Sequence, residues 1–248
     1  MMLTQIKHRA RGILRSLGFE VERRDRLAEL IPATYRHQMS RFLPTVHRRT
    51  LGRILYFERM MDRLEDVDGD IVECGVSIGH GTLYFMLLSE LMGKERHVYA
   101  FDSFQGFPAP TSADLKSDGA YEISRGILAS PQEMVTKVLH DGRVPQRLID
   151  KNLHVIPGFF EASLPHYQGR IALLHLDCDL FESYTCCLNL LYDKVVAGGL
   201  IMFDEYEDAN YPGAKIAVDQ FFSTRPEIVE EYFGFDYRKF YVRKIGSK

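Results

Sequence analysis

The sequence predicts an α/β fold with a doubly wound, mostly parallel sheet of seven strands, helices on both faces and a helical cap before it. Three observations support this prediction. Short apolar runs alternate with segments of helical periodicity from residue 70 onward. A glycine-rich turn joins the first apolar run to the segment after it, and acidic residues stand directly after several of the runs.

The composition limits the class of protein. The chain has 248 residues, of which 46% are hydrophobic and 26% charged, so one sizeable globular core with small additions is expected. The 31 basic and 34 acidic residues leave a net charge of −3, which argues against a broad nucleic-acid interface. This average hides an asymmetry, because residues 1–63 carry a net charge of +8 and the rest of the chain carries −11.

The cysteines and the apolar segments indicate the compartment. The chain has four cysteines, which form neither a C-x-x-C pair nor an evident disulfide framework, so a reducing cytosol fits best. No apolar run approaches the ~20 residues of a membrane helix, and the first residues lack the apolar core of a signal peptide. We therefore expect a cytoplasmic protein with no transmembrane segment.

The first part of the chain, residues 1–65, is expected to form a helical cap, distinct from a main domain over residues 66–248. Apolar residues recur at helical spacing over 4–17, with basic residues on the other face. This helix either docks on the protein or touches a membrane or an anionic partner. Two prolines predict a loop with a short helix over 31–49, and a longer helix follows over 50–65.

The main domain alternates strands and helices. The apolar runs predict parallel strands over 71–76, 97–102, 153–158, 171–177 and 199–205, and two final strands, expected to be antiparallel, over 227–233 and 239–245. Helical periodicity predicts helices over 82–92, 130–140, 182–195 and 214–222. Ser130 is the expected N-cap of the second of these helices, with Pro131 in its first turn.

The glycine turn after the first strand has the sequence ECGVSIGHG, residues 73–81. Glycines there allow a tight turn and a close approach to a ligand. The acidic residue suits a ligand with a sulfonium and an amine, such as S-adenosylmethionine, whose ribose diol suits a carboxylate such as Asp102. The alternatives are a dinucleotide and a turn that only packs the helix on the strand. The candidate cofactor-binding residues in the turn are Glu73, Gly75, Ser77, Gly79 and Gly81.

Carboxylates follow the fourth and fifth strands. Asp177 leaves the strand over 171–177, and Asp204 and Glu205 leave the strand over 199–205. If these strands are neighbours, the three oxygen ligands meet at one edge of the sheet, where they suit Mg²⁺ or, less selectively, Mn²⁺ or Ca²⁺. Asp179 lies in the turn after Asp177 and can act as the general base toward a substrate hydroxyl. The alternative is that these acids cap helices or are solvated.

Five stretches together resemble the macrocin O-methyltransferase family, whose members are class I, S-adenosylmethionine-dependent and metal-dependent and methylate sugar hydroxyls. The stretches are GDIVECGVSIGHG (69–81), VYAFDSFQGFPAP (98–110), IPGFFEASLP (156–165), LLHLDCDLFESYTCCLNLLYDKVVAGGLIMFDEYE (173–207) and AVDQFF (217–222). Two positions depart from the family pattern. Ser77-Ile78-Gly79-His80 stands where Trp-Arg-Gly-Gly is usual, and Asp204-Glu205 stands where Asp-Asp is common.

The resemblance implies a role for each motif. The residues implied to contact the cofactor are Glu73 and Gly75 at its methionine part, Asp102 and Ser103 at its ribose, and Gly158 and Phe159 at its adenine. Asp177, Asp204 and Glu205 would hold the metal, and Asp179 would be the catalytic base. In this family the N-terminal part covers the active site and joins subunit contacts, so a homo-oligomer is expected.

We therefore expect a Mg²⁺-dependent O-methyltransferase that acts on a hydroxyl of a sugar or of a sugar-containing small molecule, including a nucleotide-linked one, in natural-product or glycan biosynthesis. The alternatives are an O-methyltransferase of a phenol or catechol and a non-catalytic cofactor-binding subunit. The charge of residues 1–63 fits an anionic acceptor or plain surface charge. The loop over 103–129 is either a mobile lid, with aromatic side chains for a sugar ring, or a packed irregular loop.

Overall fold

The structure is a computed structural model that describes residues 48–115, 124–235 and 237–246. The chain divides into two units, Met1–His47 and Arg48–Lys248. The expected helix over 4–17 and nearly all of the expected loop over 31–49 lie outside the described residues. None of the helices within the described ranges combines the length and the apolar character that a bilayer crossing requires.

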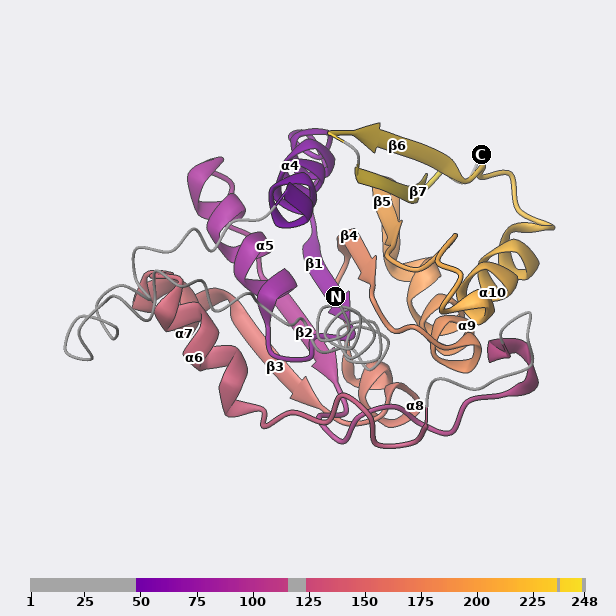
Figure 1. Cartoon of the computed structure of the whole chain (residues 1–248). Coiled ribbons are helices and arrows are strands. Elements are labelled where there is room, and N and C mark those ends of the chain that lie inside the picture. The colour runs from indigo at the N-terminus through magenta and orange to yellow at the C-terminus, as the bar shows by residue number, and fades with distance from the viewer. Residues whose placement is uncertain (1–47, 116–123, 236, 247–248) are drawn as a thin grey trace, which may run out of the picture. The chain divides into compact units, whose positions relative to one another are not determined.

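A seven-stranded sheet forms the centre of the second unit, with the strand order β3-β2-β1-β4-β5-β7-β6 (Figure 1). The parallel strands are β1 (Asp70–Cys74), β2 (Val98–Asp102), β3 (Leu153–Pro157), β4 (Ile171–Leu176) and β5 (Val195–Phe203). β7 (Tyr237–Arg243) is antiparallel to both of its neighbours, β5 and β6 (Glu230–Gly234). The fold class and all seven strands agree with the prediction. The order reverses between β1 and β4, where open sheets of this kind place their ligands.

Helices cover both faces of the sheet (Figure 1). One face carries α4 (Arg48–Asp62), α5 (His80–Leu91), α6 (Glu133–Asp141) and α7 (Gln146–Asn152). The other face carries α8 (Phe160–Ser163), α9 (Phe181–Leu191) and α10 (Pro212–Phe222). The tighter turns η1 (Ser112–Asp114), η2 (Leu164–His166) and η3 (Tyr192–Lys194) complete the described elements.

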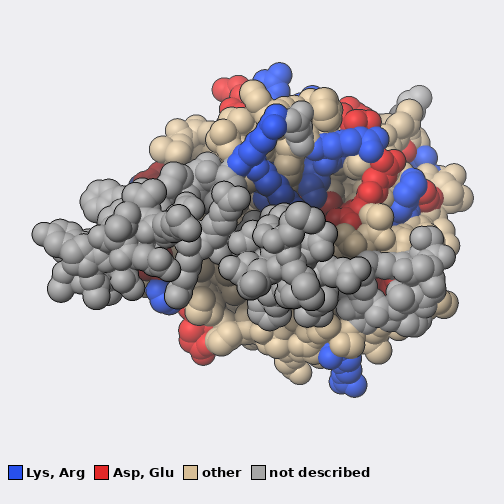
Figure 2. All heavy atoms as spheres, in the orientation of Figure 1, with Lys and Arg blue, Asp and Glu red and all other residues tan. Residues whose placement is uncertain are grey.

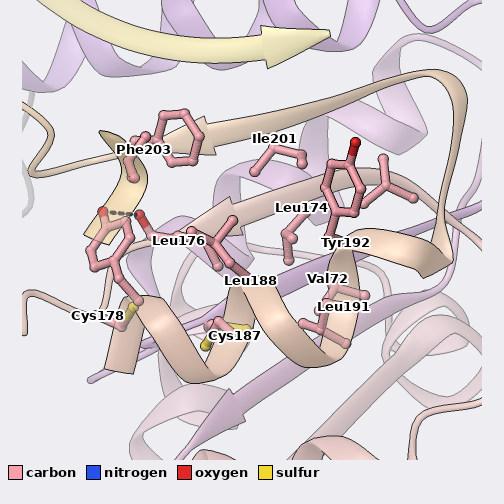
Figure 3. Packing of buried hydrophobic residues seen from close by; sticks show 14 of the residues in the cluster. Val72, Leu174, Leu176, Cys178, Cys187, Leu188, Leu191, Tyr192, Ile201 and Phe203 are labelled. Carbon is pink, nitrogen blue, oxygen red and sulfur yellow. Dashed lines mark hydrogen bonds between the residues drawn. The ribbon is translucent and has the colours of Figure 1, made fainter. Parts of the chain in front are cut away.

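The strands supply both cores because successive side chains point to opposite faces. Ile71 belongs to the core under α4 and α5, whereas Val72, the next residue of β1, belongs to the core under α9 and α10. Figure 3 shows this second core, where Leu188 of α9 lies close to Leu174 and Leu176 of β4. The near-continuous apolar runs of the sequence are therefore strands buried on both faces.

Helix α4 packs on the sheet. Phe57 is buried and stacks on Phe85 of α5, with ring centroids 4.5 Å apart and an interplanar angle of 1°. Tyr56, on the next position of the helix, contacts the rings of Tyr232 and Tyr237. The sequence assigned this helix to the cap over residues 1–65. That division of the chain stays a prediction, but the contacts of α4 bring its side chains close to the ends of the central strands.

One local prediction needs correction, and two short helices were not predicted. Helix α6 begins at Glu133, and Ser130 is not its N-cap, since the Ser130 hydroxyl donates to the carbonyl of Ser77 at 3.2 Å. The side chain therefore contacts the glycine turn rather than the first amides of the helix. Helices α7 and α8 were not predicted, because seven and four residues are too short to show a helical period.

Candidate active site

The glycine turn between β1 and α5 is shaped by close contact with two neighbours. Gly75 has φ +89°, and a Cβ there would lie 1.7 Å from the carbonyl oxygen of Asp177. A Cβ on Gly81 would lie 1.9 Å from Oε1 of Glu73. Only glycine fits at position 75, because the close atom there belongs to the backbone, whereas a Cβ at position 81 would require the Glu73 side chain to move. The turn is thereby pressed against the end of β4.

Glu73 is a buried acid at the base of this turn. Its side chain is 1% exposed, and Oε2 accepts a hydrogen bond from the Thr82 hydroxyl at 2.5 Å. Oε1 lies 3.3 Å from Nδ1 of His175 on the neighbouring strand β4. The carboxylate is therefore held from both sides and borders the cavity described below.

Asp102 ends β2 and accepts hydrogen bonds from three backbone amides. Oδ2 accepts from the amides of Val76 and Ser77 at 2.8 and 2.7 Å, and Oδ1 accepts from the amide of Phe104 at 2.7 Å. These contacts hold the glycine turn and the start of the next loop in one arrangement. Asp102 also borders the cavity.

A cavity of about 300 Å³ lies beyond the ends of β1, β2 and β4. It brings together eight of the nine predicted cofactor-binding residues, namely Glu73, Gly75, Ser77, Gly81, Asp102, Ser103, Gly158 and Phe159. The ninth, Gly79, does not line it and instead faces Val135 of α6, with φ +97°. The same cavity is lined by Asp177 and Asp179, so it reaches from the glycine turn to the predicted metal ligands.

Three side chains come close enough to hold a metal ion: His175, Asp177 and Asp204. Their ligand atoms all lie within 4.8 Å of one another. His175 is 1% exposed, and its Nε2 has no hydrogen-bond partner among the described residues. An orphaned buried nitrogen beside two carboxylates fits a divalent cation, and the imidazole extends the choice beyond Mg²⁺ toward softer metals.

The predicted ligands are thus brought together only in part. Asp177 and Asp204 meet, but the side chain of Glu205 is buried beside Tyr184, whose hydroxyl lies 2.7 Å from Oε2. Burial, together with the negative charges of Asp179 and Asp177, raises the pKa of Glu205 well above its usual range. His175 was not predicted. Its position two residues before Asp177 on one strand was an available signal, because such residues share a face of the sheet.

Two positively charged side chains also reach the acids. Nη2 of Arg53, on α4, lies 2.5 Å from Oδ2 of Asp177 and 3.8 Å from Oδ1 of Asp204. Nζ of Lys239, on β7, lies 2.9 Å from Oδ1 of Asp204. Figure 2 shows Lys and Arg side chains directly beside Asp and Glu side chains on this face. Burial alone would raise the pKa of Asp204, but Arg53 and Lys239 outweigh it and hold the pKa well below its usual range.

Asp179 lies in the turn after β4 with φ +62°. Burial raises its pKa well above the usual range, and the charges of Asp177 and Asp204 raise it further. A hydrogen bond with Tyr211 acts in the opposite direction. A carboxylate that binds protons more strongly than usual and borders a cavity is suited to accept a proton from a bound hydroxyl.

The first arm of the loop after β2 is partly packed, whereas residues 124–129 of its second arm are exposed. Asp114 is 5% exposed, and its Oδ1 accepts from the amide of Phe181, the first residue of α9, at 2.7 Å. The amide of Phe107 donates to the carbonyl of Ile127 at 3.0 Å, which joins the two arms of the loop. Phe107 and Pro108 line the cavity. Residues 116–123, the middle of the expected lid, lie outside the described residues.

The strand order, the glycine turn after β1 and the acid at the end of β2 define the class of protein as one with the methyltransferase fold. A calicheamicin methyltransferase, CalS11, has a similar solved structure, with a TM-score of 0.68 and 25% sequence identity over 88% of this chain and 90% of that chain. The family profile described as Macrocin-O-methyltransferase (TylF) matches residues 45–244. The chain therefore belongs to the macrocin O-methyltransferase family.

Curated relatives match more than half of the chain. The chain is 32% identical over 146 residues to a tetracenomycin-C rhamnosyl 4'-O-methyltransferase of Streptomyces olivaceus, covering 57% of this chain and 54% of the relative. It is 32% identical over 160 residues to a demethyldecarbamoylnovobiocin O-methyltransferase of Streptomyces niveus, covering 63% of this chain and 59% of the relative. The chain thus spans little more than half the length of these two relatives.

Proposed function

We propose that this protein is an S-adenosylmethionine-dependent O-methyltransferase that methylates a hydroxyl of a sugar or a sugar-containing small molecule, including a nucleotide-linked one. One observation carries the proposal. A single cavity is lined both by Glu73 and Asp102 and by Asp177 and Asp179. A methyl donor and a hydroxyl acceptor need such adjacent places for direct transfer. The sugar acceptor is supported by the relative whose name describes the 4'-O-methylation of a rhamnosyl-tetracenomycin.

The residues at the glycine turn would bind the cofactor. The buried carboxylate of Glu73 would attract its ammonium and sulfonium charges, and Asp102 would accept from the ribose hydroxyls. Gly75 and Gly81 would let the backbone approach, and Ser77, Ser103, Gly158 and Phe159 would complete the walls. These contacts orient the methyl group toward the end of β4.

Asp179 would remove the acceptor's proton. The acceptor oxygen forms a bond to the methyl carbon while the bond from carbon to sulfur breaks, so the sulfonium becomes a neutral thioether. The hydroxyl proton passes to a carboxylate oxygen of Asp179, whose raised pKa favours this transfer. Tyr211, hydrogen-bonded to Asp179, would hold the carboxylate in place.

A divalent cation, Mg²⁺ or Mn²⁺, would be held by His175, Asp177 and Asp204. When bound, such a cation acts as a Lewis acid that lowers the pKa of a hydroxyl group. Glu205 would help to hold the turn that carries Asp179, through its contacts with the Tyr184 hydroxyl and the Asp179 amide. It would become a metal ligand only if its side chain turned. Its burial beside Tyr184 supports the first role.

We place the protein in the cytoplasm as a homo-oligomer, without nucleic acid or membrane as a partner. The four cysteines are free, and three of them are buried, which suits a reducing compartment. Exposed Phe233 lies on the edge strand β6, where a second copy could pair. Light scattering during size-exclusion chromatography measures the oligomeric state directly, and a monomer at every concentration would contradict the proposed homo-oligomer.

The test is methyl transfer by the purified full chain. The protein is incubated with S-adenosylmethionine, MgCl₂ or MnCl₂, and in turn a nucleotide-linked deoxyhexose, a rhamnosylated aromatic natural product and a catechol. We expect S-adenosylhomocysteine and a methylated sugar with the first or second acceptor, and a loss of about 100-fold or more in Asp179→Asn. The matched control is Asp141→Asn, at an exposed acid on α6 that pairs with Lys137. Methylation of the catechol alone would favour the phenolic alternative, and binding without turnover would favour the non-catalytic one.

A further inference from the structure

Two side chains of the protein itself neutralise the acid pair Asp177 and Asp204. Arg53 comes from the middle of α4, and Lys239 comes from β7. The two are not equivalent. Lys239 contacts Asp204 through its carboxylate and its backbone carbonyl, whereas Arg53 spans the two acids with one nitrogen. Arg53 is therefore the cation that lies between the carboxylates.

One nitrogen of the Arg53 guanidinium is bonded to the acids, and a second, buried nitrogen is not. Nη2 makes the 2.5 Å contact with Asp177, but Nε is buried without a hydrogen-bond partner among the described residues. The guanidinium carbon Cζ lies over the ring of Phe57, 5.4 Å from the ring centroid. A buried donor left unpaired costs free energy, so this position is not the best one available to a guanidinium.

The same two carboxylates belong to the group of three with His175. Asp177 Oδ2, one of the carboxylate oxygens available to a metal, is the atom nearest to Nη2. A divalent cation between the acids would lie close to the charge of Arg53, and like charges at such a distance repel strongly in a partly desolvated site. The two cations therefore compete for one place.

We propose that Arg53 is a resident counter-cation of the acid pair, and that a divalent metal binds by displacing it into the cavity. This inference rests on the proposed metal site. Arg53 already lines the cavity, and its side chain is 24% exposed, so a rotation about its own bonds moves the charge toward solvent without moving α4. Lys239 stays on Asp204 because its second contact is with the backbone.

The competition has a reciprocal consequence. Whatever free energy the contact of Arg53 with the acids adds to the metal-free protein is lost when the metal binds, and the same amount is subtracted from metal affinity. Removing the charge must then do two things together. It weakens the metal-free protein, and it strengthens metal binding.

The test measures Mn²⁺ binding without turnover. Free Mn²⁺ is counted by electron paramagnetic resonance in titrations of the full chain, its Arg53→Gln and Arg53→Lys variants and the control Arg59→Gln. Arg59 lies on the same helix with an exposed side chain that pairs with Asp62, so its replacement changes the net charge equally. We expect Arg53→Gln to bind Mn²⁺ at least about fivefold more tightly, Arg53→Lys to fall between it and the unchanged protein, and Arg59→Gln to show no change.

Thermal unfolding tests the other half of the inference, the effect of Arg53 on the stability of the metal-free protein. With chelator, Arg53→Gln should melt below the unchanged protein, and saturating Mn²⁺ should reduce or abolish the difference. Equal or weaker Mn²⁺ binding by Arg53→Gln overturns the inference, because Arg53 would then preorganise Asp177 rather than compete. A failure of every protein, Arg53→Gln included, to bind Mn²⁺ overturns the metal site as well. Mn²⁺ binding that survives in Asp177→Asn overturns the proposed ligand set.

Discussion

The glycine turn and the neighbouring ends of β4 and β5 differ in how fully their polar groups are satisfied. At the glycine turn, Asp102 accepts from three amides and Glu73 from Thr82, and the backbone is pressed so closely that only glycine fits at position 75. At the ends of β4 and β5, His175 has an orphaned nitrogen and Asp179 is a buried acid with a raised pKa. The polar groups of the glycine turn are satisfied by the protein itself, whereas those at the ends of β4 and β5 would gain most from a bound ion or proton. Substitutions should therefore damage folding at the glycine turn and alter ion and proton binding at the ends of β4 and β5.

The largest expected effect is at Gly75. Gly75→Ala places a methyl group 1.7 Å from the carbonyl of Asp177, and we expect a loss of about 3 kcal/mol or more in the free energy of unfolding. The matched control is Gly93→Ala, where φ is also positive, at +69°, but nothing lies within 4 Å of the new Cβ. That control should cost only about 1 kcal/mol. Chemical denaturation measures both, and equal losses would show that the close approach is relaxed in solution.

Asp102→Ala comes next. It leaves the amides of Val76, Ser77 and Phe104 without their acceptor, so we expect a loss of about 2 kcal/mol in stability and weaker binding of S-adenosylhomocysteine. Denaturation and titration calorimetry measure the two effects. Asp68→Ala, at an exposed acid that pairs with Lys94, is the control and should change neither. Unchanged cofactor binding in Asp102→Ala would remove Asp102 from the ribose site.

His175→Gln tests whether His175 is a metal ligand at the ends of β4 and β5. The amide keeps a polar group of similar size but replaces an imidazole nitrogen, which borderline metals prefer. We expect Ni²⁺ affinity to fall by about tenfold, while Mg²⁺ affinity changes much less. Competition titrations against a metal-sensitive dye measure both ions. An equal fall for the two ions, or none for either, would exclude His175 as a ligand.

The smallest effect concerns the pH dependence of stability with chelator present. The pKa of Asp179 is raised in the folded protein, so its contribution to stability is complete below the unfolded carboxyl value of about 4 and is lost as pH rises through the folded value. Asp179→Asn removes this loss. The variant should be more stable than the unchanged protein by about 1 kcal/mol near pH 8, with little difference near pH 4. Asp204, whose pKa is lowered, has the opposite dependence and is present in both proteins.

Sequence periodicity was sufficient for the sheet and for the meeting of Asp177 with Asp204, because buried parallel strands are apolar and end at one edge. It was not sufficient for the direction of Glu205. Adjacent residues at a strand end point to opposite faces, so Asp204 and Glu205 could not both reach Asp177 unless the strand turned. Arg53 and Lys239 could not be found by spacing, since they approach from 124 and 62 positions away along the chain from Asp177. Only the packing of α4 and β7 brings them there.

The place of β7 in the sheet also sets an order of events during synthesis. β5 ends at Phe203, but the neighbour that covers its outer edge, β7, starts only at Tyr237. While the intervening residues emerge, β5 presents an uncovered row of amides and carbonyls, which is the kind of edge on which nascent chains aggregate. Lys239 arrives with the same strand. Lys239 therefore reaches Asp204 later in synthesis than Arg53 does, and a chain interrupted between Phe203 and Tyr237 would lack both the outer neighbour of β5 and this second counter-charge.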